Sequence, residues 1–286
     1  MLRSSTIQLL RFHFSFFLMP VYWFALSQTT AINTSRAIAV FVILHLLIYP
    51  SSNGYNSYMD RDTGSIGGLK VPKQPTRQLF YTSVFLDMIA LICSLLISVW
   101  FFAGVIAYIA ASRAYSYRGI RLKKYPISGY LTVVIFQGAI TFFLVMHGSS
   151  EESTLRVPIL GMIAASLLIG GFYPLTQIYQ HMQDKADGVI TISYKLGYRG
   201  TFIFTAIVYC MAMITLAIYL ATNLVLGKFF IMQIFFAPVL VYFSWWFYKI
   251  YHDTKAANFS NTMRMNIIAS VFTNAAFIYL LISEKI

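Results

Sequence analysis

The chain has 286 residues, of which 58% are apolar and only 10% are charged, and its net charge is +12 at pH 7. Soluble domains carry roughly a quarter charged residues, so this composition excludes a water-soluble globular protein. The positive charge falls in loops between apolar segments, and we therefore expect membrane lipid, and no nucleic acid, as its surroundings.

Apolar windows recur along the whole chain at about the 20-residue length that crosses a bilayer as a helix. We predict an all-α, polytopic membrane bundle of about nine transmembrane helices, with no soluble segment of domain size. The first window contains Arg11 and lacks a small-residue cleavage pattern, which predicts a retained helix and not a signal peptide. The windows cover residues 7–26, 32–52, 79–99, 100–116, 129–147, 157–178, 201–222, 229–248 and 264–283.

Basic residues are unequally divided between the two sets of loops. Most of the 21 Lys and Arg residues lie at the N-terminus or in the loops after the second, fourth, sixth and eighth windows; the exceptions are Arg36, Arg156, Lys228 and Lys285. Basic loops stay in the cytoplasm. We predict a multi-pass protein of the bacterial inner membrane with its N-terminus in the cytoplasm and its C-terminus outside.

The end of the second window is repeated at the end of the sixth. The segment YPSSNGYNSYMDRDTG (residues 49–64) aligns without a gap with YPLTQIYQHMQDKADG (residues 173–188), at an offset of 124. We predict one transmembrane domain, residues 1–286, built from two related halves of about 1–125 and 126–286. The aligned polar residues are Asn53, Asn56 and Asp60 in the first motif and Gln177, Gln180 and Asp184 in the second.

Each motif places its oxygen-bearing side chains on one face of a helix, because the spacing is i, i+3 and i+7. A glycine four residues after each aspartate, Gly64 or Gly188, predicts the end of each helix. Asp62 and Asp187 lie near these ends and belong to the wider candidate site.

Carboxylate and amide oxygens are the ligands that Mg²⁺ prefers in proteins. We therefore predict Asp60 and Asp184 as catalytic residues, and as metal ligands together with the four amides of the two motifs. The alternative is that both polar stripes only hold helices together.

Cations follow both motifs and the fourth window. Arginine binds phosphate oxygens bidentately and lysine acts as a point charge, so carboxylates surrounded by cations indicate a metal–diphosphate site. The alternative is that these loops only orient the helices. The predicted diphosphate-binding residues are Lys73, Arg77, Arg118, Arg121, Lys123 and Lys195, with Tyr117 beside them in the sequence.

These motifs resemble those of the UbiA-type intramembrane prenyltransferase superfamily. NSYMDRD resembles its first aspartate motif (commonly NDxxDxxxD), YSYRGIRLKKYPISGYL its cytoplasmic Tyr/Arg/Leu/Lys stretch, and QHMQDKADGVITISYKLG its second motif. The resemblance implies nine helices around a lipid-accessible cavity, with Mg²⁺ and a prenyl diphosphate held between the motifs. It also implies transfer of the prenyl group to an aromatic or other lipophilic acceptor. Nothing in the sequence demands a protein partner.

The chain has fewer acids than the family motifs. If Asn56 opens the first motif, Asp60 is the middle acid and Gly64 replaces the last; if Asp60 is the last acid, as the repeat favours, Asn56 replaces the middle one. In the second motif Gln180 replaces the first acid. A catalytically idle family member is therefore an alternative, and a membrane transporter or lipid-binding protein is another.

Overall fold

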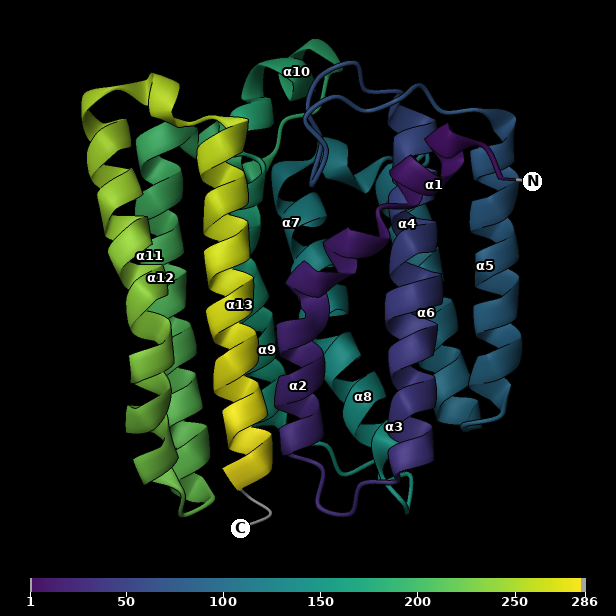
Figure 1. Cartoon of the computed structure of the whole chain (residues 1–286), viewed down its shortest axis with the longest axis vertical. Coiled ribbons are helices and arrows are strands. Elements are labelled where there is room, and N and C mark those ends of the chain that lie inside the picture. Colours follow the sequence, from purple (N-terminus) through teal and green to yellow (C-terminus); the bar gives the residue numbers. More distant parts are fainter. Residues whose placement is uncertain (1, 284–286) are drawn as a thin grey trace.

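The computed structural model describes residues 2–283, and within this range the chain forms helices and no β-strand (Figure 1). Nine helical segments of the described chain are long and apolar enough to cross a membrane, which confirms the predicted fold class. Lys285 lies outside the described residues. The nine segments are Ser4–Ser27, Thr34–Asp60, Arg77–Leu95, Val99–Ser116, Pro126–Ser149, Ile159–Ala186, Ile192–Thr222, Leu226–His252 and Phe259–Ser283.

Several of these segments are divided into shorter helices. In chain order the elements are α1 (Ser4–Leu10), η1 (Phe12–Leu18), α2 (Met19–Ser27), α3 (Thr34–Phe41), η2 (Val42–Ile48), α4 (Tyr49–Asp60), α5 (Arg77–Leu95), α6 (Val99–Ser116), η3 (Leu122–Lys124), α7 (Pro126–Val134), η4 (Ile135–Ile140), α8 (Thr141–Ser149), α9 (Ile159–Thr176), η5 (Ile178–Gln180), α10 (His181–Ala186), α11 (Ile192–Thr222), α12 (Leu226–His252), η6 (Thr254–Ala256) and α13 (Phe259–Ser283).

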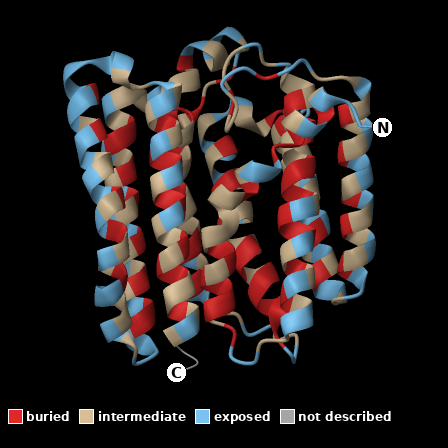
Figure 2. Ribbon diagram, viewed as in Figure 1, coloured by how far each residue is buried: buried red, intermediate tan, exposed pale blue. Residues whose placement is uncertain are grey.

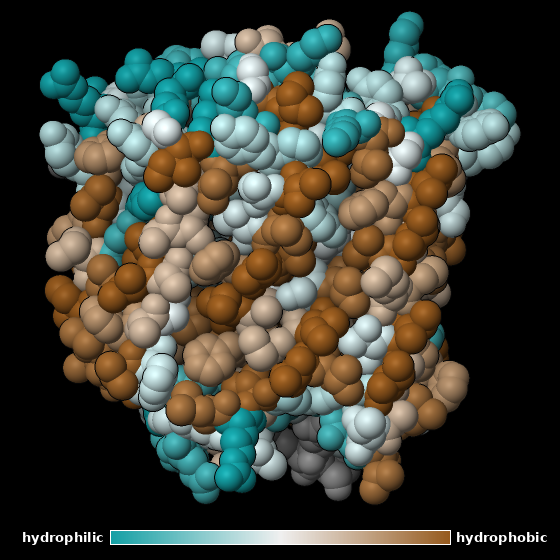
Figure 3. All heavy atoms as spheres, turned by 180° about the vertical axis from the view of Figure 1, so that it is seen from behind, coloured by the Kyte–Doolittle hydropathy of each residue, from teal (hydrophilic) through white to brown (hydrophobic). Residues whose placement is uncertain are grey.

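The outside of the bundle carries an apolar belt between two hydrophilic ends (Figure 3). Large apolar side chains such as Ile234 and Phe230, both more than 60% exposed, point away from the bundle, as lipid-facing residues do. Exposed residues occur along the outer faces of the helices and buried ones face inward (Figure 2). The first helix begins and the last helix ends at opposite ends of the bundle (Figure 1), as the nine spans of the described chain require.

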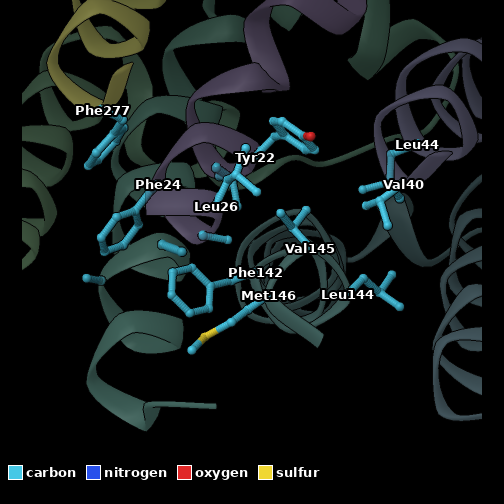
Figure 4. Packing of buried hydrophobic residues seen from close by; sticks show 14 of the residues in the cluster. Tyr22, Phe24, Leu26, Val40, Leu44, Phe142, Leu144, Val145, Met146 and Phe277 are labelled. Carbon is cyan, nitrogen blue, oxygen red and sulfur yellow. The ribbon is translucent and has the colours of Figure 1, made fainter. Parts of the chain in front are cut away.

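An aromatic core joins the first, fifth and ninth spans in the half of the bundle that lies away from α10 (Figure 4). Phe24 of α2 stacks on Phe277 of α13, with ring centroids 4.6 Å apart, and meets Phe142 of α8 edge-on at 5.0 Å. In lipid such contacts stabilise through close packing more than through release of water. They hold these three spans together in this half of the bundle.

A buried polar cluster holds α4 against α5 and α6. Ser51 of α4 donates to Asp87 of α5 at 2.6 Å, and Asp87 also pairs with Arg113 of α6. An unpaired carboxylate at this depth would be costly, so the three groups stabilise one arrangement of the helices. The cluster fixes the helix that carries the first motif.

The predicted continuous helix over residues 7–26 is broken in the structure. Arg11 adopts a left-handed conformation (φ 49°) between α1 and η1, and its Nη1 donates to the carbonyl oxygen of Gly67 at 3.0 Å. A charged group inside an apolar segment turns towards polar partners, and here the break in the helix allows that turn.

The two motifs end differently from each other. α4 is continuous to Asp60 and ends four residues before Gly64, because Arg61 takes the left-handed conformation (φ 55°) and its N–H bonds to Ser57. The prediction of a helix end near Gly64 is therefore wrong for the first motif. In the second motif Gly188 (φ 68°) does follow the helix end, as predicted.

The second motif also lacks the predicted unbroken helix. α9 ends at Thr176, two residues after Pro174, and a 3₁₀ turn leads into the short α10. Proline alone does not account for this break, because Pro50 holds the equivalent position in the first motif and α4 continues unbroken to Asp60. The Gln177–Asp184 stripe is interrupted where the first stripe is continuous.

Candidate active site

Side chains of both motifs line one cavity, here called the charged cavity, at the end of the bundle that carries α10. The cavity has a volume of about 110 Å³. One part of the lining comes from α4 and the loop after it, and another part comes from the segment that follows α9, through η5 and α10 to Thr191. The polar residues that line it are Arg11, Asn56, Asp60, Asp62, Tyr115, Lys123, Gln177, Gln180, Gln183, Asp184, Asp187 and Thr191.

Asp60, at the end of α4, is already paired with protein cations. Its side chain is 4% exposed; Oδ2 accepts a hydrogen bond from Lys123 Nζ, and Oδ1 lies 3.5 Å from an Arg121 nitrogen. Oδ1 accepts no hydrogen bond. One oxygen of this buried carboxylate is therefore left for a further ligand.

Asp184, the equivalent residue of the second motif, lies on α10 and has no hydrogen-bond or ion-pair partner among the described residues. Near it, Gln177 also presents a buried side-chain oxygen without a partner. Both groups face the cavity. They offer two oxygen ligands that no protein group competes for.

Two further carboxylates, Asp62 and Asp187, complete the acidic lining, and their pKa values are shifted in opposite directions. Asp62 accepts a hydrogen bond from Gln183 at 2.6 Å; burial raises the pKa of this carboxyl, and the charge of Asp60 raises it further. Burial also acts to raise the pKa of Asp187, but the hydrogen bond and charge of Arg121 outweigh it and lower that pKa.

The loop between α6 and α7 connects the two motifs through its cations. Arg121 pairs with Asp60 and with Asp187, and Arg118 donates to the Met59 carbonyl oxygen at 2.7 Å. Together with Lys123, these cations bring the loop of the first half of the chain across to the second motif. Tyr117 of the same loop is 48% exposed and does not line the charged cavity.

Of the six predicted diphosphate-binding residues, only Lys123 lines the cavity. Arg118 and Arg121 contact acids of its lining, and the other three lie elsewhere. Lys73 donates to Ser4 at 2.6 Å on the outer surface, Arg77 begins α5, and Lys195 lies in the first turns of α11. None of these three residues, Lys73, Arg77 and Lys195, lines the charged cavity. These residues follow the motifs in the sequence, but their side chains do not reach the cavity.

A second cavity of about 210 Å³, here called the inner cavity, continues from the charged one into the bundle. Asn53, the remaining predicted residue, lines this cavity and not the charged one. The two cavities share the lining residues Arg11, Asn56, Gly67, Tyr115, Gln177 and Gln180. Molecules bound in the two cavities would therefore be neighbours.

The prediction missed four polar residues that line the charged cavity: Arg11, Tyr115, Gln183 and Thr191. Arg11 had a usable signal, since an ionisable residue within an apolar window points to a functional position. Gln183 had none, because its role depends on the loop that brings Asp62 to it. Gly67 is needed in that loop, because a Cβ there would lie 2.8 Å from the Phe14 ring.

The donor set fits Mg²⁺ that is bound together with a diphosphate. No group of three His, Cys, Asp or Glu residues within the described range is arranged to hold a metal ion by itself. Mg²⁺ is usually bound through one or two carboxylates plus substrate phosphates. The free oxygens of Asp60, Asp184 and Gln177 supply such a partial set.

Comparison with known proteins identifies the class of protein that this fold and site define. The model of the UbiA prenyltransferase family matches residues 17–268. The chain belongs to this family, as its motifs indicated. A search of curated proteins finds no match.

Solved structures of family members share the whole fold at low sequence identity. A UbiA homologue from Archaeoglobus fulgidus bound to GPP and Mg²⁺ has a TM-score of 0.69 at 18% identity, over 97% of this chain and 99% of that one. A UbiA homologue from Aeropyrum pernix K1 gives 0.68 at 18%, over 93% and 97%. A digeranylgeranylglyceryl phosphate synthase gives 0.64 at 16%, over 98% of both chains.

Proposed function

We propose that this protein is a Mg²⁺-dependent prenyltransferase, which moves an isoprenyl group from a prenyl diphosphate to an aromatic or other lipophilic acceptor within the membrane. The observation that carries the proposal is that acids of both motifs line one cavity together with Lys123, and that Arg121 of the same α6–α7 loop pairs with two of these acids. The family and the structures of relatives bound to GPP or DMAPP with Mg²⁺ support it.

The residues have separate roles in this proposal. Asp60 and Asp184 would hold Mg²⁺, with Asn56, Gln177 and Gln180 as neutral oxygen donors. When bound, Mg²⁺ neutralises charge on the diphosphate as it leaves. Arg11, Lys123 and Arg121 supply further positive charge; Arg121 and Lys123 must then exchange their carboxylate partners for phosphate oxygens, which bind arginine equally well.

The reaction breaks the bond between C1 of the prenyl group and the bridging oxygen of the diphosphate. The acceptor forms a new bond to C1 and loses a proton. The residues of the site keep the leaving diphosphate in a charged cavity, while C1 faces the inner cavity, from which Tyr108 and Phe136 help to exclude water. Aromatic rings also stabilise a positive charge that develops on C1.

The orientation and the two-halves architecture remain part of the proposal. From the bias of Lys and Arg we infer that the end of the bundle with α10 and the N-terminus face the cytoplasm, where a soluble diphosphate would have access to the site. We propose a bacterial inner membrane as the location, and the repeat at residues 49–64 and 173–188 as a trace of two related halves.

The test is transfer by purified protein in detergent from a panel of labelled prenyl diphosphates, with and without Mg²⁺. Activity should need the metal and fall at least about 10³-fold in an Asp60→Ala/Asp184→Ala double variant, since both acids act on the leaving group. Asp253→Ala is the control, because this acid lies in the connection between α12 and α13. Full turnover by the double variant would refute the proposal.

A catalytically idle member of the family is the second candidate. The observation that favours it is the replacement of family acids by Asn56 and Gln180 in this chain. Such a protein would bind Mg²⁺ and pyrophosphate but release no pyrophosphate from any prenyl diphosphate. Measuring binding and release on the same preparation separates the two candidates.

A further inference from the structure

Three cations that do not line the charged cavity lie at the edge of the bundle, where α1 meets the start of α5 (Figure 1). The backbone N–H of Arg3 donates to Gln78 Oε1 at 2.7 Å, which places Arg3 beside Arg77. Lys73 Nζ donates to Ser4 Oγ at 2.6 Å and so holds the loop before α5 against α1. Arg3, Lys73 and Arg77 are therefore kept together, and we call this group the basic edge.

No carboxylate of the described chain compensates the basic edge. All three of its side chains are exposed, and none forms an ion pair with a described residue. The only acids among residues 1–125 are Asp60, Asp62 and Asp87, each already bound to another side chain. Like charges held close together repel each other, and an anion that binds between them relieves this cost.

The face of α5 that begins at Arg77 changes from charged to aromatic to aliphatic along the helix. Tyr81, Phe85, Met88 and Ile92 are each more than half exposed, and steps of three or four residues place them on one side of the helix. From Arg77 to Ile92 the helix rises about 22 Å, which exceeds the half bilayer of about 15 Å that one acyl chain crosses. This order of side chains matches the order of headgroup, membrane interface and acyl chain in a phospholipid.

Two cations at the same end of the second half differ from the basic edge. Arg199 donates to the Tyr251 carbonyl oxygen at 2.7 Å. Lys249 lies over the Trp245 ring, with its Nζ 4.1 Å from the ring centroid, a contact that stabilises a cation. The protein itself satisfies part of these two charges, whereas the basic edge depends on a partner from outside the chain.

We propose that the basic edge and the exposed face of α5 bind one anionic phospholipid, with its phosphate at Arg3, Lys73 and Arg77 and an acyl chain along residues 81–92. Arginine binds two phosphate oxygens at once, and lysine adds a point charge. A zwitterionic lipid fits less well, because its ammonium group would lie beside three cations without a free carboxylate. The inference does not depend on the proposed transferase activity, and it can be tested without catalysis.

The experiment measures lipid binding to the purified full chain in a nonionic detergent by native mass spectrometry. Dioleoyl phosphatidylglycerol is the anionic probe, and dioleoyl phosphatidylcholine has the same chains with a zwitterionic headgroup. The wild-type protein should bind phosphatidylglycerol about tenfold more tightly, and glycerol 3-phosphate, which has an anion without chains, should not displace it. Equal affinity for the two lipids overturns the inference. Displacement by glycerol 3-phosphate overturns the assignment to a lipid, since a free phosphate would then suffice.

Matched variants locate the effect. Lys73→Gln/Arg77→Gln should lower the affinity for phosphatidylglycerol about tenfold and leave that for phosphatidylcholine unchanged. Lys249→Gln/Lys255→Gln is the control, because it removes the same charge from exposed positions at the same end of the bundle, and it should keep the preference. A preference lost in both double variants, or in neither, overturns the assignment to the basic edge. All four side chains are exposed, so folding should be retained.

A third variant tests the position of the acyl chain. Phe85→Ala keeps every cation and removes apolar surface, so it should weaken binding of both lipids by the same factor, about threefold. Unchanged binding of both lipids by Phe85→Ala overturns the placement of the chain along α5.

Other partners of these cations would give different results. If the basic edge steered prenyl diphosphate to the charged cavity, Lys73→Gln/Arg77→Gln would raise the KM of transfer and keep the lipid preference. If it docked an acidic protein, the wild-type chain would prefer neither lipid. Either result overturns the inference. If the preference depends on Lys73 and Arg77 but no prenyl diphosphate is consumed, the lipid site stands and the transferase proposal fails.

Discussion

The two motifs are equivalent in sequence and unlike in their electrostatic surroundings. Asp60 ends a straight helix and is paired with Lys123 and Arg121, whereas Asp184 lies on a short helix after a break and has no partner in the described chain. The difference arises because the cations of the α6–α7 loop contact the first motif and Asp187, and leave Asp184 unpaired. The repeat therefore preserves the positions of the polar groups but not the groups that pair with them.

This contrast separates stability from function. The Asp60 pair stabilises the folded state at the cost of occupying a potential metal ligand. The unpaired Asp184 destabilises the folded state and is available to a ligand. Functional sites commonly break local rules of stability in this way, and variants at the two positions should respond in opposite directions.

The largest effect is expected at the Asp60–Lys123 pair. Removing one partner of a mostly buried ion pair leaves an uncompensated charge, at a cost of about 3 kcal/mol. Asp60→Asn and Lys123→Met should each lower the stability of the protein in detergent by this amount, and the double variant should lose less than the sum. Thermal and denaturant unfolding would measure it.

Lys124→Met is the control for this pair, because Lys124 is the exposed neighbour of Lys123 in the same loop. It should change stability by less than about 0.5 kcal/mol. If Lys123→Met and Lys124→Met were equally mild, the pairing of Asp60 would not be the feature that distinguishes the first motif.

The sequence predicted much of this fold, for a physical reason. The need to pair every backbone group in lipid leaves helices as the solution for a chain of this composition, and a window of 20 residues averages over local errors. All nine predicted windows overlap spans of the structure. The breaks at Arg11 and after Pro174 escaped prediction because they depend on single side chains and their tertiary partners.

The candidate site was predictable only where a helix fixes the direction of its side chains. Asn56 and Asp60 lie on one face of α4, and the alignment of the two motifs pairs them with Gln180 and Asp184. All four residues line the charged cavity. Lys73, Arg77 and Lys195 lie in or beside loops, where a sequence gives the sign of a charge and not the position of its side chain. Arg121 contacts the site because its loop folds across both motifs.

A second prediction asks whether restoring a missing acid strengthens metal binding. Gln180→Asp adds a carboxylate beside Asp184 at the position where the family has an acid. An added charge close to a divalent cation should lower the Mg²⁺ concentration needed to bind pyrophosphate by about tenfold. The readout is the thermal shift produced by pyrophosphate over a Mg²⁺ titration, which needs no turnover.

Gln183→Asp is the matched control for charge, because it adds an acid three residues further along that lines the same cavity and faces Asp62 instead. It should improve Mg²⁺ binding less than Gln180→Asp does. An unchanged Mg²⁺ requirement in Gln180→Asp would mean that the second motif does not approach the metal.

A third prediction concerns Asp184 alone. Asp184→Asn removes a partly buried carboxylate that has no partner, so stability should stay constant or rise by up to about 1 kcal/mol. Prenyl transfer should nevertheless fall at least about 10²-fold, because a ligand of the leaving group is lost. Parallel unfolding and transfer measurements on this variant and on Asp60→Asn test the contrast. If Asp184→Asn and Asp60→Asn both lost stability, the two motifs would not differ in this way.

The smallest effect should come from Asp187, which ends the second motif and is the one acid there that has cationic partners. Because its folded-state pKa is lowered, it contributes stability above the ordinary pKa of an aspartate and loses it as the pH falls through the lowered value. Its side chain is 38% exposed, so solvent screening limits the contribution to about 0.5 kcal/mol. Asp187→Asn should therefore be slightly less stable than wild type at pH 7, and the difference should disappear once the pH has fallen below the lowered pKa of Asp187. Asp253→Asn is the exposed control. A deficit that grows on acidification would show that Arg121 and Arg118 do not stabilise the charged form, and the second motif would then have no ion pair to compare with that of Asp60.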